Sequence, residues 1–284
     1  MNVLIVPSGN PRTCDSARLL ASRLIVAGID AVVQSPEADE LAVPLDELSL
    51  VVPMGGDGTF LAAARLIDFA SVPLLAFNYG SLGFLAGNPE RDEVELIADA
   101  LAGDIVFERR STLQAHVTGA DGSVVEATAL NEVVYARGAS GRVVEYAWGI
   151  DDTRIAHLKA DGLVIATATG STGYALSAGG PVVSPGYKGL VVVPVAPHAL
   201  NTRAVVSGPS DVIEVDVLGA RAEEASVYLD GVELDIVHPV HIQARRGDKE
   251  LLFALGGGEF FTNVSRVFFG GPFPNAHEEP AHAR

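Results

Sequence analysis

Cysteine and positive charge are both scarce in this chain of 284 residues. Cys14 is the only cysteine, so an internal disulfide is excluded and a reducing compartment is favoured, and we expect a cytoplasmic protein. Lys and Arg total 19 against 36 Asp and Glu, which gives a formal net charge of −17. This excess repels phosphate backbones and anionic lipids, so neither nucleic acid nor a membrane is expected as a partner. The apolar runs are also too short to span a bilayer.

The chain is rich in apolar residues, which make up 48% of it and suffice for a large core. Its length suggests two domains. Short apolar runs alternate with helical patterns in the first third, which favours a parallel sheet with helices on both faces. The expected strands are residues 3–6, 31–33, 50–52 and 73–77, and the expected helices are residues 15–27, 60–68 and 90–101. We therefore expect an α/β domain over residues 1–105.

From about Ile105 the pattern changes to alternating apolar and polar residues, as in residues 114–118, 133–135, 143–148, 211–217, 226–229 and 240–244. Asp121-Gly122 and Asp230-Gly231 have the composition of tight hairpin turns, and we interpret the second pair as a turn only. An all-β domain is expected over residues 106–257. Residues 258–284 are expected to pack back on the first domain, with a disordered, proline-broken tail. The predicted fold class is thus α/β: an N-terminal parallel-sheet nucleotide-binding domain followed by a mainly antiparallel all-β domain.

The segment Gly55-Gly-Asp-Gly-Thr59 lies between a predicted strand and a predicted helix. Backbone N–H groups and the positive end of a helix dipole suit a phosphate there, and glycines let it approach closely. A second interpretation stays open, in which Asp57 or Thr59 merely caps the helix and the glycines form a tight turn. The spacing is neither the dinucleotide fingerprint nor the lysine-ended P-loop.

Three other segments accompany this loop. Residues 77–85 form a second glycine-bearing loop after a strand, and neighbouring loops of this kind create a crevice at the edge of an open α/β sheet. Asn131-Glu132 heads a predicted strand, and residues 160–181 run from a strand into hydroxyls, glycines and Tyr174. Taken singly, Asn131 is also explained as a turn cap, Tyr174 as a core aromatic and Lys159 as a surface cation.

In their order and spacing, these motifs resemble the NAD kinase family. The resemblance covers residues 50–235, and residues 161–181 are its most specific part. The glycine–aspartate loop alone is shared with diacylglycerol, sphingosine and phosphofructokinase-type kinases. Ala168 and Gly173 depart from the proline and alanine that are common in the family, and Gly173 bears on the fit around the adenine ring.

The resemblance implies transfer of the γ-phosphoryl of ATP to the 2′-hydroxyl of the adenosine ribose of NAD⁺, giving NADP⁺ and ADP. A ribose hydroxyl is a weak nucleophile until a base accepts its proton, and the implied catalytic base is Asp57. The implied ATP phosphate-binding residues are Gly55, Gly56, Gly58 and Thr59. The implied NAD-binding residues are Asp57, Gly58, Phe84, Asn131, Glu132, Lys159, Asp161, Thr172, Gly173, Tyr174 and Ser177.

Asp161 is implied to act across a subunit interface, so a homodimer or homotetramer is expected. A divalent metal, Mg²⁺, is expected to arrive with the nucleotide, without a dedicated protein cage. Two alternatives stay open: a lipid or sugar kinase of the same superfamily, and a non-catalytic NAD(P) sensor. The sequence also leaves open whether polyphosphate replaces ATP and whether NADH is accepted.

Overall fold

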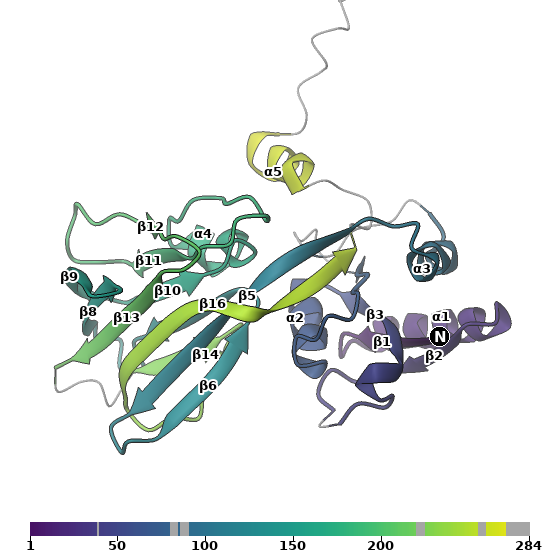
Figure 1. Cartoon of the computed structure of the whole chain (residues 1–284), viewed down its shortest axis with the longest axis horizontal. Coiled ribbons are helices and arrows are strands. Elements are labelled where there is room, and N and C mark those ends of the chain that lie inside the picture. The colour runs from purple at the N-terminus through teal and green to yellow at the C-terminus, as the bar shows by residue number, and fades with distance from the viewer. Residues whose placement is uncertain (39, 80–84, 86–90, 220–224, 255–259, 271–284) are drawn as a thin grey trace, which may run out of the picture.

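The computed structural model describes residues 1–38, 40–79, 85, 91–219, 225–254 and 260–270, which form two lobes (Figure 1). The first lobe is built on a four-stranded sheet in the order β2-β1-β3-β4. Its strands are β1 (Asn2–Pro7), β2 (Asp30–Val33), β3 (Leu48–Gly55) and β4 (Phe77–Asn78). A 3₁₀ turn, η1 (Leu45–Glu47), comes directly before β3. All its pairings are parallel, which confirms the predicted sheet.

The helices of this lobe cover both faces of the sheet, as predicted. They are α1 (Pro11–Val26), α2 (Asp57–Leu66) and α3 (Glu93–Ala102). Alternate residues of β1 point to opposite sides, so Ile5 packs with α1 and α3 while Leu4 packs with α2. The expected start of α1 at residue 15 is wrong, because Asn10 caps the helix by accepting the N–H of Arg12 and Pro11 occupies its first position. The helix expected from residue 60 likewise begins earlier, at Asp57.

The second lobe consists of two six-stranded antiparallel sheets in the orders β12-β11-β10-β7-β14-β15 and β6-β5-β16-β13-β8-β9. The strands are β5 (Phe107–Gly119), β6 (Val124–Ala129), β7 (Glu132–Ala136), β8 (Val144–Ile150), β9 (Thr153–Ala160), β10 (Gly162–Ala166), β11 (Val191–Val195), β12 (Val205–Val206), β13 (Val212–Leu218), β14 (Ser226–Leu229), β15 (Val232–Glu233) and β16 (Pro239–Ala254). Side chains of both sheets, among them Tyr146, Trp148 and Tyr135, form one core between them. The predicted all-β character is confirmed.

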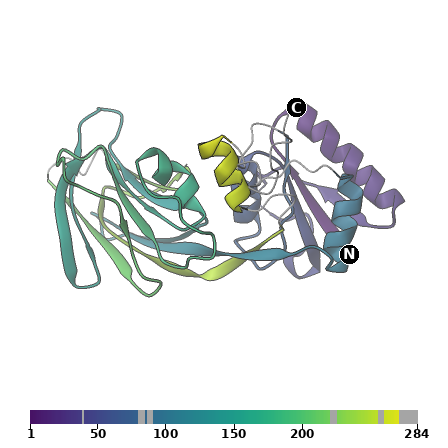
Figure 2. The same cartoon turned by 90° about the horizontal axis from the view of Figure 1, so that it is seen from above.

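The long strands β5 and β16 extend from the second lobe into the first (Figures 1 and 2). Leu251 and Phe253 of β16 belong to the core beneath α2, and the ring centroids of Phe253 and Phe60 lie 5.2 Å apart. Leu74 bridges β3 to β16 in the backbone, because it pairs with both Val51 and Phe253. Backbone pairing therefore ties β3 to the second lobe, and the Phe60–Phe253 contact packs α2 against it.

The last described helix is α5 (Phe260–Phe269), in which Phe260 is buried and Phe261 and Phe269 are exposed. The expected return of residues 258–284 to the first lobe stays a prediction, as do the boundaries at residues 105 and 257. The tail expected to be disordered lies outside the described residues.

Candidate functional site

The glycine loop joins the end of β3 to the start of α2. Gly56 is the N-cap of α2 and, as a glycine, offers no side chain to the N–H groups of the first turn. A Cβ on Gly55 would lie 2.2 Å from Oγ1 of Thr59, so only glycine fits there. A Cβ on Gly56 or Gly58 would meet no neighbouring atom of the described residues within 4 Å, so this side of the loop is open toward them. Because the N-cap residue has no side chain and one side of the loop is open, the arrangement favours an anion over a turn capped by its own N-cap residue.

Asp57 lies at the first position of α2 and faces the second glycine loop. Its Oδ1 accepts the backbone N–H of Leu85 at 3.1 Å, 28 residues along the chain. The two loops leave the sheet side by side, because Gly55 of β3 pairs with Asn78 of β4. The expected crevice between neighbouring loops stays a prediction, because residues 80–84 and 86–90 lie outside the described residues. Phe84, one of the implied NAD-binding residues, lies outside the described residues.

Asn131 and Glu132 lie at the start of β7, with 9% and 8% of their surface exposed. Within the described part of the chain, Oδ1 of Asn131 and Oε2 of Glu132 are buried without a hydrogen-bond partner. Buried polar atoms are nearly always paired, so two orphaned acceptors side by side indicate a missing donor. A ligand that carries hydroxyl or amino groups would supply it.

The segment after β10 wraps around these two residues. It contains the 3₁₀ turn η2 (Gly170–Thr172) and the short helix α4 (Tyr174–Ser177). The backbone N–H of Thr167 donates to the carbonyl of Asn131 at 2.8 Å, and a Cβ on Gly170 would lie 2.2 Å from that carbonyl oxygen. Only glycine at position 170 lets the two backbones approach so closely.

The next residues of this segment bring further implied NAD-binding residues to Glu132. The carboxylate of Glu132 accepts the backbone N–H of Tyr174. A Cβ on Gly173 would lie 3.2 Å from Oε2 of Glu132, so the glycine leaves room beside that oxygen. The Tyr174 side chain is 43% exposed, which excludes the alternative of a core aromatic. Asn131, Glu132, Gly173 and Tyr174 therefore form one cluster, with the half-buried Thr172 on the same turn.

The inward-facing side chain of Asp230 is a contact that the sequence did not reveal. Asp230 and Gly231 both have positive φ, 46° and 79°, and join β14 to β15 as the predicted two-residue turn. The interpretation as a turn only is wrong, because the Asp230 carboxylate points inward and accepts the N–H groups of Leu130, Asn131 and Glu132 at 2.8–3.1 Å. Its backbone carbonyl also accepts Arg65 of α2 at 3.4 Å.

The two neighbouring carboxyl groups shape the electrostatics of the cluster. Burial, and secondarily the charge of Asp230, raise the pKa of Glu132 to about 7, against the opposing hydrogen bond from Tyr174. Burial also raises the pKa of Asp230 above its ordinary value, and the hydrogen bonds from three backbone N–H groups offset this rise only in part. Glu132 therefore changes its charge near neutral pH, where the protonated form donates a hydrogen bond and the ionised form only accepts.

Three of the implied NAD-binding residues have different surroundings. Lys159 is exposed and pairs with Glu145 at 3.4 Å, and Asp161 pairs with Arg137 at 3.2 Å. Ser177 is exposed at the end of α4. The structure does not bring these side chains to Glu132 within the described chain, so their roles stay predictions. The sequence analysis also missed Arg110, a buried cation of β5 that pairs with Glu108 and lies 3.5 Å from Oγ1 of Thr169.

Among the described residues, no group of three or more His, Cys, Asp or Glu side chains is arranged to hold a metal ion. No helix in the described part of the chain is long and apolar enough to cross a membrane.

Comparisons with known proteins identify relatives of both lobes. The model of the ATP-NAD kinase N-terminal domain matches residues 39–105, and that of the ATP-NAD kinase C-terminal domain matches residues 130–255. The NAD kinase of Ralstonia nicotianae is 38% identical over 86% of this chain and 84% of its own length. The NAD kinase of Methylibium petroleiphilum is 40% identical over 76% of this chain and 73% of its own length.

Two solved structures share the fold. The yeast NADH kinase complexed with NADH superposes with a TM-score of 0.84 at 21% identity, covering 100% of this chain and 90% of that one. The NAD kinase of Archaeoglobus fulgidus in complex with ATP superposes with a TM-score of 0.74 at 23% identity, covering 95% of this chain and 98% of that one.

Proposed function

The chain belongs to the NAD kinase family, and we propose that it transfers the γ-phosphoryl of ATP to the 2′-hydroxyl of the adenosine ribose of NAD⁺. The observation that carries this proposal is the pair of buried, unpartnered acceptors, Oδ1 of Asn131 and Oε2 of Glu132. Ribose hydroxyls and the adenine amino group are donors of the kind that they require. The exposed Tyr174 side chain, whose backbone N–H holds Glu132, supplies an aromatic surface for the adenine.

Asp57 is the proposed general base. A carboxylate is needed to accept the proton of the 2′-hydroxyl as the phosphoryl group is transferred. The N–H of Leu85 holds Oδ1 of Asp57 in place, so the carboxylate is oriented before the substrate arrives. The first turn of α2, whose N-cap is Gly56, binds the ATP phosphates together with Gly55, Gly58 and Thr59.

In the proposed reaction, a divalent ion, Mg²⁺, binds together with ATP. When bound, it neutralises charge on the transferring phosphoryl group. The loop itself contributes backbone N–H groups and the dipole of α2.

The same proposal includes a cytoplasmic location and a homodimer or homotetramer. The lone Cys14 and the use of ATP and NAD⁺ support the location. Support for the oligomer comes from Asp161, which lies away from the Glu132 cluster in its own subunit and would reach a neighbour's nicotinamide. Lys159 lies two residues before Asp161, near the end of β9, and would bind a phosphate of the same ligand.

The proposal is tested by incubating the purified protein with ATP, Mg²⁺ and NAD⁺ and measuring NADP⁺. Parallel reactions replace ATP with inorganic polyphosphate and NAD⁺ with NADH, which defines the donor and the acceptor. Formation of NADP⁺ is the expected result. Binding of NAD⁺ without product would instead support the sensor alternative, and turnover only on a lipid or sugar would support the other kinases of the superfamily.

A further inference from the structure

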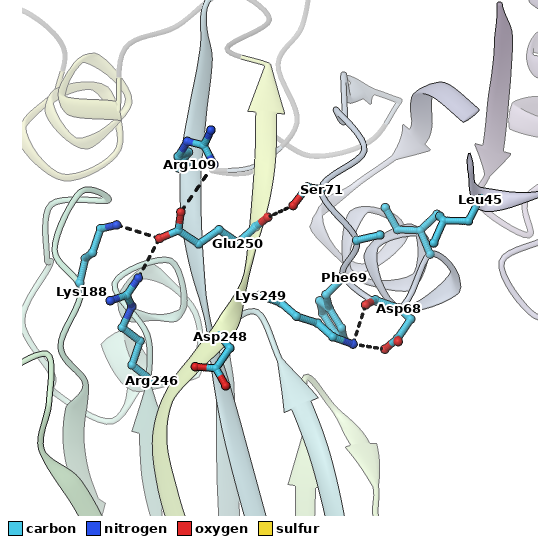
Figure 3. Close-up of a pocket in the computed structure, with 12 residues that line it drawn as sticks. Leu45, Asp68, Phe69, Ser71, Arg109, Lys188, Arg246, Asp248, Lys249 and Glu250 are labelled. Carbon is cyan, nitrogen blue, oxygen red and sulfur yellow. Dashed lines mark hydrogen bonds and ion pairs between the residues drawn. The ribbon is translucent and has the colours of Figure 1, made fainter. Parts of the chain in front are cut away.

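A charged pocket lies at the junction of the two lobes, around the loop that follows α2 (Figure 3). It has a volume of about 730 Å³ and is open to solvent. Its walls come from residues 67–71 after α2, from β5 and β16, and from the loop that precedes β11. Asp57 and this pocket therefore lie at opposite ends of the same helix.

Three cations converge on one carboxylate in this pocket. Oε1 of Glu250 accepts Nζ of Lys188 at 2.7 Å and Nη2 of Arg246 at 2.8 Å, and Nη1 of Arg109 lies 3.8 Å from Oε2 (Figure 3). A single carboxylate neutralises only one of the three positive charges. The surplus is notable in a chain with a net charge of −17. A local positive site of this kind attracts anions against the field of the whole molecule.

The remaining charges of the pocket do not cancel this surplus. Lys249 donates to the side chain and carbonyl of Asp68 at 2.7 Å and 2.9 Å, which is a separate, balanced pair. Asp248 turns outward, with 84% of its side chain exposed, and its nearest cation is Arg245 at 3.6 Å. The excess positive charge is thus concentrated between Lys188, Arg246 and Arg109.

Two further features indicate a site that awaits a ligand. Nε of Arg246 is buried with no hydrogen-bond partner among the described residues, although such donors are normally paired. Asp68 and Phe69 have φ of 48° and 53°, a left-handed conformation that is unfavourable for a bulky residue such as phenylalanine. Backbone strain of this kind concentrates at functional sites.

The backbone holds the cations in place. The register of β16 against β5 shifts between Arg246 and Glu250, which marks a β-bulge. The hydroxyl of Thr112 anchors the bulge by donating to the carbonyl of Lys249 at 2.7 Å, and a Cβ on Gly247 would lie 2.3 Å from that hydroxyl oxygen. Bulges re-aim side chains, and this one directs Arg246 and Glu250 together toward Lys188.

We propose that this junction pocket is a second anion site, in which Lys188, Arg246 and Arg109 bind a small oxyanion with at least two negative charges, such as a diphosphate or a phosphate monoester. When the site is empty, the carboxylate of Glu250 forms ion pairs with these cations, so it competes with the ligand for them. Arginine suits this role because its planar guanidinium group matches phosphate geometry.

The test is calorimetric titration of the full chain with sodium pyrophosphate and, separately, glucose 6-phosphate as a monoester. Lys188→Gln should weaken one binding event about tenfold, because it removes a charge from the site. Glu250→Gln should tighten the same event by a similar factor, because it removes the competing carboxylate. Arg154→Gln is the matched control, since Arg154 forms an equally short ion pair with Asp216 at 2.7 Å elsewhere on the second lobe.

The opposite effects of the two variants separate a binding site from a purely structural ion-pair network. A structural network predicts that both variants lower the melting temperature and that pyrophosphate restores neither. If the site binds anions, excess pyrophosphate should raise the melting temperature of Glu250→Gln more than that of the unmodified chain. Equal pyrophosphate affinities in the unmodified chain, Lys188→Gln and Glu250→Gln would overturn the proposal, and this result would leave the proposed kinase activity untouched.

Discussion

The carboxylate of Asp230 accepts the backbone N–H of Asn131 at 2.8 Å across 99 residues of sequence. The same carboxylate accepts the N–H groups of Leu130 and Glu132. A turn in one hairpin therefore fixes the backbone of the strand that carries the proposed NAD-binding side chains. Asp230 acts here as a positioning residue, because its contacts are with the backbone of Asn131 and Glu132.

Asp230→Ala should lower the free energy of unfolding by about 2–4 kcal/mol, because it leaves buried N–H groups without an acceptor. It should also raise KM for NAD⁺, since Asn131 and Glu132 lose their fixed positions. Chemical denaturation and steady-state kinetics provide the measurements. Asp121→Ala is the matched control, because Asp121 precedes glycine in a similar but exposed turn. Similar losses in the two variants would show that Asp230 is only a turn residue.

The raised pKa of Glu132 predicts a specific dependence of stability on pH. Burial raises this pKa from 4.5 to about 7, so between those values the folded state binds a proton that the unfolded state has released. Stability contributed by neutral Glu132 is complete below about pH 4.5 and is lost as the pH rises to 7. At about 1.4 kcal/mol per pH unit, the unmodified chain should lose roughly 3.5 kcal/mol relative to Glu132→Gln over this range.

Urea denaturation of both proteins from pH 4.5 to 8 measures this difference. Glu250→Gln serves as a control of opposite sign, because hydrogen bonds from Lys188 and Arg246 lower the pKa of Glu250. The contribution of Glu250 is fully present above its unfolded pKa and is lost only at more acidic pH. The difference in the free energy of unfolding between Glu250→Gln and the unmodified chain should therefore stay constant across the measured pH range. A pH-independent difference for Glu132→Gln would refute the raised pKa.

Asp57→Asn should lower kcat by roughly 10²–10⁴, which is the usual contribution of a general base. The change in KM for NAD⁺ should be smaller, because asparagine retains an oxygen that can accept the N–H of Leu85. NADP⁺ formation at saturating ATP and NAD⁺ measures both parameters. Near-normal turnover would remove Asp57 from the role of base.

Tyr174→Ala should raise KM for NAD⁺ more than it lowers kcat, because stacking on the adenine stabilises the ground state and the transition state alike. The substitution preserves the backbone N–H that Tyr174 donates to Glu132, so it tests the ring alone. Tyr174→Phe is the control and should keep KM close to that of the unmodified chain. An unchanged KM in Tyr174→Ala would place the ring outside the pocket.

The sequence by itself determined the features that depend on near neighbours in the chain. The alternation of apolar runs predicted the parallel sheet and the antiparallel lobe, and Gly55–Thr59 predicted a glycine loop that leads into a helix. The predicted start of α1 was wrong, because the cap formed by Asn10 and Pro11 decides where the helix begins. These features follow from backbone geometry and local periodicity.

Only the tertiary structure decided which distant side chains meet. The turn at Asp230-Gly231 was predictable, but the inward carboxylate was not, because its partners lie about a hundred residues away. The raised pKa of Glu132 likewise depends on burial, and the junction pocket depends on a bulge that aligns Arg246 with Lys188. Desolvation and long-range hydrogen bonds arise from packing, so no local pattern in the sequence records them.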